Sequence, residues 1–250
     1  MVRERNTKRK LAAQQDANLP PSLQIPCGAD DKCPILRPGI ETLKLLGRTK
    51  SGDAQRPSCP LGASCIYANA AAADTRTWTR ELEIGAGLGR FILARARKNP
   101  DTHILGLEIE RVRAARIDVA ARKEGLTNLS LVCADAAPFL EFCVPPESLA
   151  AVYIFFPDPW PRARHEKNRI FNPETIALIH RALARGGVLH AATDHTLYFG
   201  RMREVMEPET AAGRFTPASP LIRTEDELTD FELKFLAKGM KVNAAAWEKN

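Results

Sequence analysis

Between Trp78 and Met206, short apolar runs alternate with helical patterns, and this alternation constrains the fold more than any other feature. Five strands are expected, one ending at Ile84 and the others at 104–109, 128–133, 149–156 and 188–193. The helices between and after them are expected to end at Lys98 or to span 111–123, 136–142, 173–184 and 197–206. Strands that alternate with helices form a parallel sheet covered by helices on both faces. The sequence therefore predicts an α/β fold with a doubly wound, mostly parallel sheet.

Several residues mark the ends of these helices. Asn172 and Pro173 occupy the N-cap and the first helical position, the order that helix starts prefer. Gly125 lies just past one helix, which is a usual C-terminal stop. By the same rule, we expect Gly186-Gly187 to end the helix that starts at Pro173.

The C-terminal tail has a different pattern. Two runs with apolar residues, 233–236 and 241–247, flank Gly239. We therefore expect the chain to finish with an antiparallel hairpin.

Charge and hydropathy narrow the possible partners. The chain has 250 residues and a formal net charge of +6, which favours a polyanionic partner. Its longest apolar run, Leu149–Pro157, is far too short to span a membrane, and no apolar stretch follows the basic N-terminus as in a secretory signal. We expect a cytoplasmic protein that acts as a monomer or homodimer with no obligatory protein partner.

Residues 1–75 form a basic, loop-rich segment that we expect to be partly disordered, and residues 76–250 form the folded domain. The basic start of the segment is expected to be a solvated tail, an arm that touches a phosphate backbone, or both. Its cysteines come in two widely spaced pairs, and this spacing favours free thiols over a zinc site, so no metal is predicted. These cysteines are Cys27, Cys33, Cys59 and Cys65.

A glycine-rich loop follows the first strand. Gly85, Gly87 and Gly89 allow a ligand to approach the backbone, and the helix behind them favours negative charge. The spacing is G-x-G-x-G, whereas a dinucleotide site requires G-x-G-x-x-G. Glu83, two positions before the first glycine, would repel a pyrophosphate but would suit a cationic ligand.

Two more acidic residues follow at strand ends. Glu108 ends the second strand, where a carboxylate can accept hydrogen bonds from both hydroxyls of a ribose. Asp135 follows the third strand and can accept from an adenine amino group. Together with Glu83 and the glycine loop, they predict a site for S-adenosylmethionine, whose sulfonium and amino groups are positive.

The fourth strand runs into a rigid acidic turn. Asp158 stands between Pro157 and Pro159, which restrict the backbone on both sides of it. Open α/β sheets bind ligands at this edge, beyond the carboxyl ends of the strands. Trp160 follows and is expected either to pack under the turn or to stack on a ligand. A basic run, 162–169, comes next.

With these motifs in place, residues 78–247 resemble the bacterial tRNA (guanine-N7)-methyltransferases, which have the Rossmann-like class I fold. The resemblance rests on five stretches: Leu82–Gly89, Gly106–Ile109, Phe155–Pro161 with Arg164-His165, Ala192–Asp194, and Thr229–Glu232. It implies transfer of a methyl group from S-adenosylmethionine to N7 of guanine 46 in the variable loop of tRNA.

The resemblance also implies roles for individual residues. It places Glu83, Glu108 and Asp135 at the cofactor and the basic run, including Arg162 and Arg164, at the tRNA. Around the guanine it places Asp158, which we take as the catalytic residue, together with Asp194, Thr229 and Glu232.

Two positions depart from the family. Arg162 stands where the family usually has lysine, and Asn168 stands where it usually has arginine. Two alternatives therefore stay open: a non-catalytic RNA-binding protein on a methyltransferase scaffold, or a methyltransferase with another substrate. His190 lies in a buried-strand pattern, which favours a core histidine.

Overall fold

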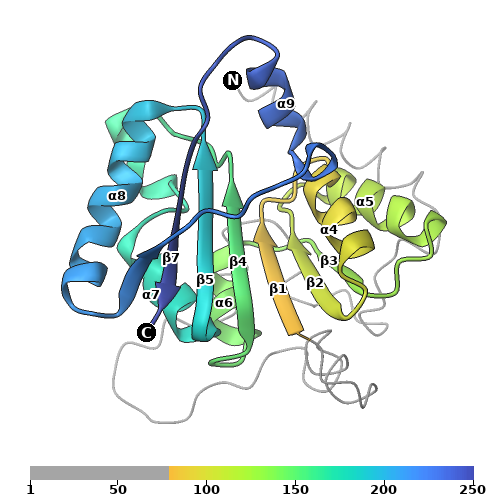
Figure 1. The fold of residues 1–250 in the computed structure, drawn as a ribbon, viewed down its shortest axis with the longest axis horizontal. Helices are drawn as coiled ribbons and strands as arrows, with labels where there is room; N and C mark the ends of the chain where they lie inside the picture. The colour runs from red at the N-terminus through yellow and green to blue at the C-terminus, as the bar shows by residue number, and fades with distance from the viewer. Residues whose placement is uncertain (1–78) are drawn as a thin grey trace, which may run out of the picture. The chain divides into compact units, whose positions relative to one another are not determined.

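The computed structural model of the chain describes residues 79–250 (Figure 1). The expectations for residues 1–75, including the four cysteines, lie outside the described residues. Within residues 79–250, no helix is long and apolar enough to cross a membrane.

One mixed sheet of seven strands organises the described residues, in the order β3-β2-β1-β4-β5-β7-β6. Strands β1 to β5 pair in parallel, whereas β7 runs antiparallel to both β5 and β6. The doubly wound, mostly parallel sheet with antiparallel C-terminal strands is therefore confirmed. The strands are β1 (Thr79–Ile84), β2 (Thr102–Leu107), β3 (Leu129–Val132), β4 (Leu149–Phe155), β5 (Leu183–Thr193), β6 (Phe215–Ala218) and β7 (Asn243–Lys249).

The helices connect these strands largely as expected. Asn172 caps α7, because its side-chain oxygen accepts a hydrogen bond from the backbone N–H of Thr175 at 2.8 Å. Gly125, with φ of +69°, follows the end of α5. The α-helices are α4 (Arg90–Lys98), α5 (Arg111–Lys123), α6 (Ala136–Phe142), α7 (Pro173–Ala182), α8 (Thr196–Ala211) and α9 (Asp230–Leu236).

One of the two strands expected in the C-terminal hairpin was predicted wrongly. Residues 233–236 belong to helix α9, and the strand that pairs with β7 is β6, which precedes α9. Strand β6 has only four residues and includes Pro217, which removes a ladder donor and is tolerated at the edge of a sheet.

The role of Gly186-Gly187 was also predicted wrongly. Helix α7 already ends at Ala182, and both glycines lie inside β5 beside a shift in its register with β4. A Cβ on Gly187 would lie 2.8 Å from the carbonyl oxygen of Ala184 and 2.9 Å from that of Leu149. Glycine is therefore required at Gly187 for close backbone approach, not to stop a helix.

Residues 219–229, which we call the C-terminal strap, run from β6 across one face of the sheet to α4 (Figure 1). Leu221 of the strap packs against a core cluster that includes Phe91, Tyr153 and Phe155. At the far end, Arg90 of α4 donates a hydrogen bond to the carbonyl oxygen of Glu225. The strap therefore covers apolar sheet surface and carries α9 to the edge where β1 and β4 end.

Strand order reverses between β1 and β4, because β1 is followed in the sheet by β2 on one side and by β4 on the other. In doubly wound folds, ligands bind beyond the carboxyl ends of the strands at such a point. The candidate site lies there.

Candidate active site

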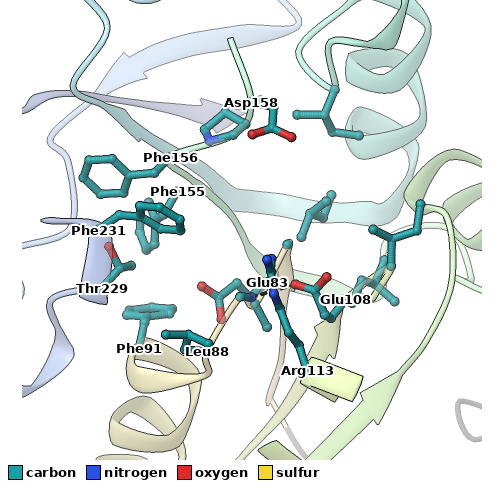
Figure 2. A pocket seen from close by; sticks show the side chains of 18 of the residues that line it. Glu83, Leu88, Phe91, Glu108, Arg113, Phe155, Phe156, Asp158, Thr229 and Phe231 are labelled. Atoms are coloured by element: carbon teal, nitrogen blue, oxygen red, sulfur yellow. Dashed lines mark hydrogen bonds between the residues drawn. The ribbon is translucent and has the colours of Figure 1, made fainter. Parts of the chain in front are cut away.

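A cavity of about 550 Å³ opens at the carboxyl ends of β1, β2 and β4 (Figure 2). It is lined by the glycine loop, by the turn after β4 and by the first turns of α9. The expected site residues that line it are Glu83, Gly85, Gly87, Glu108, Asp135, Asp158, Asp194 and Thr229. Residues from strand ends far apart in the sequence therefore converge on one space.

The glycine loop is fixed from behind by the end of β2. The backbone N–H groups of Gly85 and Ala86 both donate to the carbonyl oxygen of Leu107, at 2.8 and 2.9 Å. Gly89 lies outside the cavity lining and has φ of +86°; a Cβ there would come within 2.6 Å of Ile117 on α5. Gly89 therefore lets the loop pack against α5, whereas Gly85 and Gly87 face the cavity.

Glu108 braces the same loop. Its carboxylate accepts hydrogen bonds from the backbone N–H groups of Gly87 and Glu110, both at 2.8 Å. The residue is buried, yet it still lines the cavity. Each oxygen has a further lone pair, so Glu108 can support the loop and accept from a ligand hydroxyl at once.

Glu83 forms the buried floor of the cavity. It is 2% exposed, and its Oε2 has no hydrogen-bond partner among the described residues. Burial raises the pKa of this carboxyl to about 8, Arg223 opposes the rise, and Glu108 adds to it. A buried carboxylate oxygen without a partner is a site for a ligand that brings a positive charge or a donor.

Arg223, which the sequence motifs did not mark, acts on Glu83 through its positive charge, which lowers the pKa of that carboxyl. Its guanidinium donates to both oxygens of Glu232 at 2.6 and 2.9 Å, and the two side chains are only 6% and 7% exposed. The guanidinium also sits over the ring of Phe155, 4.3 Å from its centroid. Glu232 lies outside the cavity lining, and its carboxylate is paired with Arg223.

Asp135 and two arginines of the basic run, Arg162 and Arg164, are exposed to solvent. Asp135 is exposed and caps α6, because its side chain accepts from the backbone N–H of Ala137 at 3.2 Å. Arg162 and Arg164 are exposed outside the cavity lining, and Arg164 donates to the ring of His165 at 3.1 Å.

Asp158 is presented by a turn with unusual backbone geometry. Phe156 and Trp160, on either side of the Pro-Asp-Pro stretch, have positive φ angles of 50° and 41°. Arg169 donates to the carbonyl oxygens of Pro159 at 2.8 Å and Trp160 at 3.1 Å. The basic run, which was predicted only to contact tRNA, thus also contributes an arginine that holds the turn.

The structure also describes the surroundings of Trp160 and His190. Trp160 lines the cavity and packs edge-on against His165, with ring centroids 5.5 Å apart, and its two expected roles stay predictions. His190 is a core histidine, as expected: it stacks on Tyr153 and accepts from the N–H of Leu221. Burial lowers its pKa to about 4.

The residues of the cavity fit S-adenosylmethionine. Glu83 offers a buried acceptor without a partner in the described part of the chain, and Glu108 offers carboxylate lone pairs at the end of β2. The loop between them leaves space, since a Cβ on Gly85 would meet nothing within 4 Å.

Comparison with known proteins agrees with this geometry. Residues 79–245 match a family model described as "Putative methyltransferase". A tRNA (guanine-N(7)-)-methyltransferase of Alcanivorax borkumensis is 38% identical over 169 residues, which cover 68% of this chain and 70% of that protein. The chain belongs to this methyltransferase family.

A second relative and a solved structure define how far the likeness extends. A tRNA (guanine-N(7)-)-methyltransferase of Mycolicibacterium vanbaalenii is 41% identical; the match covers 67% of this chain but only 64% of that protein. The solved structure of the 16S rRNA methyltransferase KamB is 16% identical and covers 73% of this chain and 94% of that chain, with a TM-score of 0.55. This structural likeness supports the class I methyltransferase fold.

Proposed function

We propose that the chain transfers a methyl group from S-adenosylmethionine to N7 of a guanine in tRNA, at position 46 of the variable loop, and so forms 7-methylguanosine. The observation that carries the proposal is the convergence of Glu83 and Asp158 on one cavity from the ends of neighbouring strands. One carboxyl is buried and the other exposed, so they suit two different ligands.

On the cofactor side, Glu83, Glu108, Asp135 and the loop at Gly85 and Gly87 would hold S-adenosylmethionine. When bound, the cofactor supplies a methyl group on a positively charged sulfur, and transfer leaves that sulfur neutral and the purine positive. Glu83 is suited to this ligand because a bound cation would favour the ionised form of this carboxyl, which burial otherwise keeps protonated, and the two charges interact strongly in a buried site.

On the substrate side, the chemistry needs no general base. Guanine N7 has a lone pair and no proton, so nothing must be removed before it is methylated. Asp158 and Asp194 line the cavity and would stabilise the positive charge that develops on the base. Carboxylates are also acceptors for guanine N1–H and the exocyclic amino group, whereas adenine N1 is itself an acceptor. The pair would therefore select guanine over adenine.

The basic run would meet the tRNA backbone. Arg162 and Arg164 are exposed close to the turn that presents Asp158. Phosphate contacts of this kind give affinity that falls steeply with salt. Asn168, where the family usually has arginine, is also exposed and lines the cavity, so one cationic contact of the family would be absent here.

The test is transfer of tritiated methyl from S-adenosylmethionine to unmodified total tRNA, followed by nucleoside analysis and mapping. We expect label in 7-methylguanosine at position 46. Label in another nucleoside would point to a different substrate, and cofactor binding without any label would favour an RNA-binding protein.

We also propose that the chain acts in the cytoplasm as a monomer or homodimer without an obligatory protein partner. Purified protein that methylates tRNA alone, with a mass measured by light scattering, would test the last two points. A requirement for a second protein would contradict the proposal.

A further inference from the structure

One wall of the cavity is aromatic. Phe156 follows β4, and Phe231 and Phe235 lie on α9; all three line the cavity. The ring centroids of Phe156 and Phe235 are 5.8 Å apart, and those of Phe235 and Phe231 are 6.3 Å apart with an interplanar angle of 23°. These rings form one continuous surface, which we call the aromatic wall.

Phe231 is the open end of this wall. It is 48% exposed, whereas the nearby core rings of Phe91 and Phe155 are 1% and 7% exposed. A single exposed apolar residue needs no explanation. Phe231, however, faces a cavity and stacks on a second ring, so its exposed surface is part of a site.

The surroundings of Phe231 match a flat base with polar edges. Figure 2 shows Phe231 beside Phe156 and Thr229, on the opposite side of the cavity from Glu108 and Arg113. Asp158 lies on the same cavity, so one space combines a ring face with acceptor oxygens. Protein sites for unpaired bases combine these same two elements, stacking for the face and hydrogen bonds for the edges.

The proposed reaction gives the ring a further role. An aromatic face carries negative electrostatic potential and attracts cations. A guanine that becomes positively charged during methylation is therefore held more strongly by a phenylalanine face than a neutral guanine is. An aliphatic side chain of similar size lacks this property.

We propose that Phe231 is a substrate-positioning residue on which the target guanine stacks, an inference that rests on the proposed function. The base lies against the ring while Asp158 meets its polar edge. Helix α9 and its N-cap Thr229, whose side chain accepts from the N–H of Glu232 at 3.1 Å, fix the ring at the cavity.

The test compares Phe231→Leu, Phe231→Ala and Phe231→Tyr with the control Ile222→Ala. Ile222 is an apolar residue of the strap that is 94% exposed and lies outside the cavity lining. For each protein we would measure kcat/KM for tRNA methylation, the affinity for S-adenosylmethionine and the salt dependence of tRNA binding.

Loss of one base–aromatic stack by alanine substitution corresponds to a decrease of about 5-fold to 150-fold. We expect Phe231→Leu and Phe231→Ala to lower kcat/KM within that range, and Phe231→Tyr and Ile222→Ala to stay near wild type. Cofactor affinity and the salt slope should not change, because Phe231 neutralises no phosphate.

A second measurement does not depend on turnover. The wild-type protein with S-adenosylhomocysteine should bind 7-methylguanosine 5′-monophosphate more tightly than guanosine 5′-monophosphate, and Phe231→Leu should remove this preference. A cation held by the ring face predicts this difference, whereas simple apolar packing does not.

Three outcomes would overturn the inference, and they differ from one another. Wild-type kcat/KM in Phe231→Leu would make the aromatic wall a packing feature only. Weaker S-adenosylmethionine binding in Phe231→Leu would assign the ring to the cofactor. Absence of tRNA methylation by the wild-type protein would overturn the proposed function itself, before any variant is compared.

Discussion

On the β1 side of the cavity, Glu83, Gly85, Gly87 and Glu108 come from one short stretch of chain and two neighbouring parallel strands. On the β4 side, the turn at Asp158, the end of β5 at Asp194 and the start of α9 come from segments far apart in the sequence. The first side is fixed by backbone hydrogen bonds between adjacent strand ends, such as those to Leu107.

The second side depends on arginine side chains that hold neighbouring turns and helices in place. Arg169 holds the carbonyl oxygens of the Asp158 turn, and the pair of Arg223 and Glu232 ties the strap to α9. The comparison shows that the cofactor loop is held by hydrogen bonds of its backbone to the end of β2, whereas the substrate side is held by arginine side chains. It follows that variants on the two sides should fail in different ways.

The largest effect is expected from Arg223→Met. The change leaves Glu232 as a buried carboxylate without its arginine, and breaking such a pair lowers the free energy of unfolding by about 3–5 kcal/mol. The control Arg97→Met removes a more exposed pair with Glu124, for which about 0–1 kcal/mol is expected. Urea unfolding of both variants measures this difference, and equal losses would contradict it.

Asp158→Ala should affect catalysis and leave the fold intact. Removing a group that stabilises charge in the transition state lowers the rate by about 10²–10³-fold. Asp158 is exposed in its turn, so the melting temperature should stay near that of the wild type. Asp101→Ala, an exposed aspartate at the opposite edge of the sheet, is the matched control. A large loss of melting temperature in Asp158→Ala would show that the residue is structural.

Per pH unit, the smallest expected effect is the pH dependence of stability that Glu83 causes. Its pKa is about 8 in the folded chain and 4.5 as an ordinary carboxyl, so between these values the folded state keeps a proton that the unfolded state has lost. Stability of the cofactor-free protein should therefore fall as pH rises through this window, by up to about 1.4 kcal/mol per pH unit.

Glu83→Gln should remove this slope, because glutamine does not titrate. Urea unfolding between pH 5 and pH 8 compares the two proteins across roughly this window. Parallel stability curves for wild type and Glu83→Gln would mean that Glu83 is not held neutral by burial.

The two sides also differ in how well the sequence predicted them. The first strand and the helix after it could be predicted because strand, glycine loop and helix follow one another directly in the sequence. Helix α9 was missed, although Thr229 with Glu232 three residues later is a helix-start signature. Its seven residues are too few for an apolar pattern to distinguish helix from strand.

The ion pair of Glu232 with Arg223 could not be predicted for a different reason. Its partner Arg223 is nine residues away with a turn between, and only the folded strap brings the two together. Asp135 was predicted to bind the cofactor because it follows a strand, and its additional contact as the N-cap of α6 was not predicted. The sequence shows at which strand or helix end an acidic residue lies, but it does not show which hydrogen-bond donors surround its side chain.

The most direct test of the account separates the two sides in one experiment. For Glu83→Gln and Asp158→Asn, we would measure the affinity for S-adenosylmethionine by calorimetry and the single-turnover rate of tRNA methylation at saturating cofactor. The account predicts that Glu83→Gln loses cofactor affinity, and that Asp158→Asn binds cofactor like wild type but transfers methyl slowly. Loss of cofactor affinity in Asp158→Asn, or wild-type affinity in Glu83→Gln, would contradict the division of the site between β1 and β4.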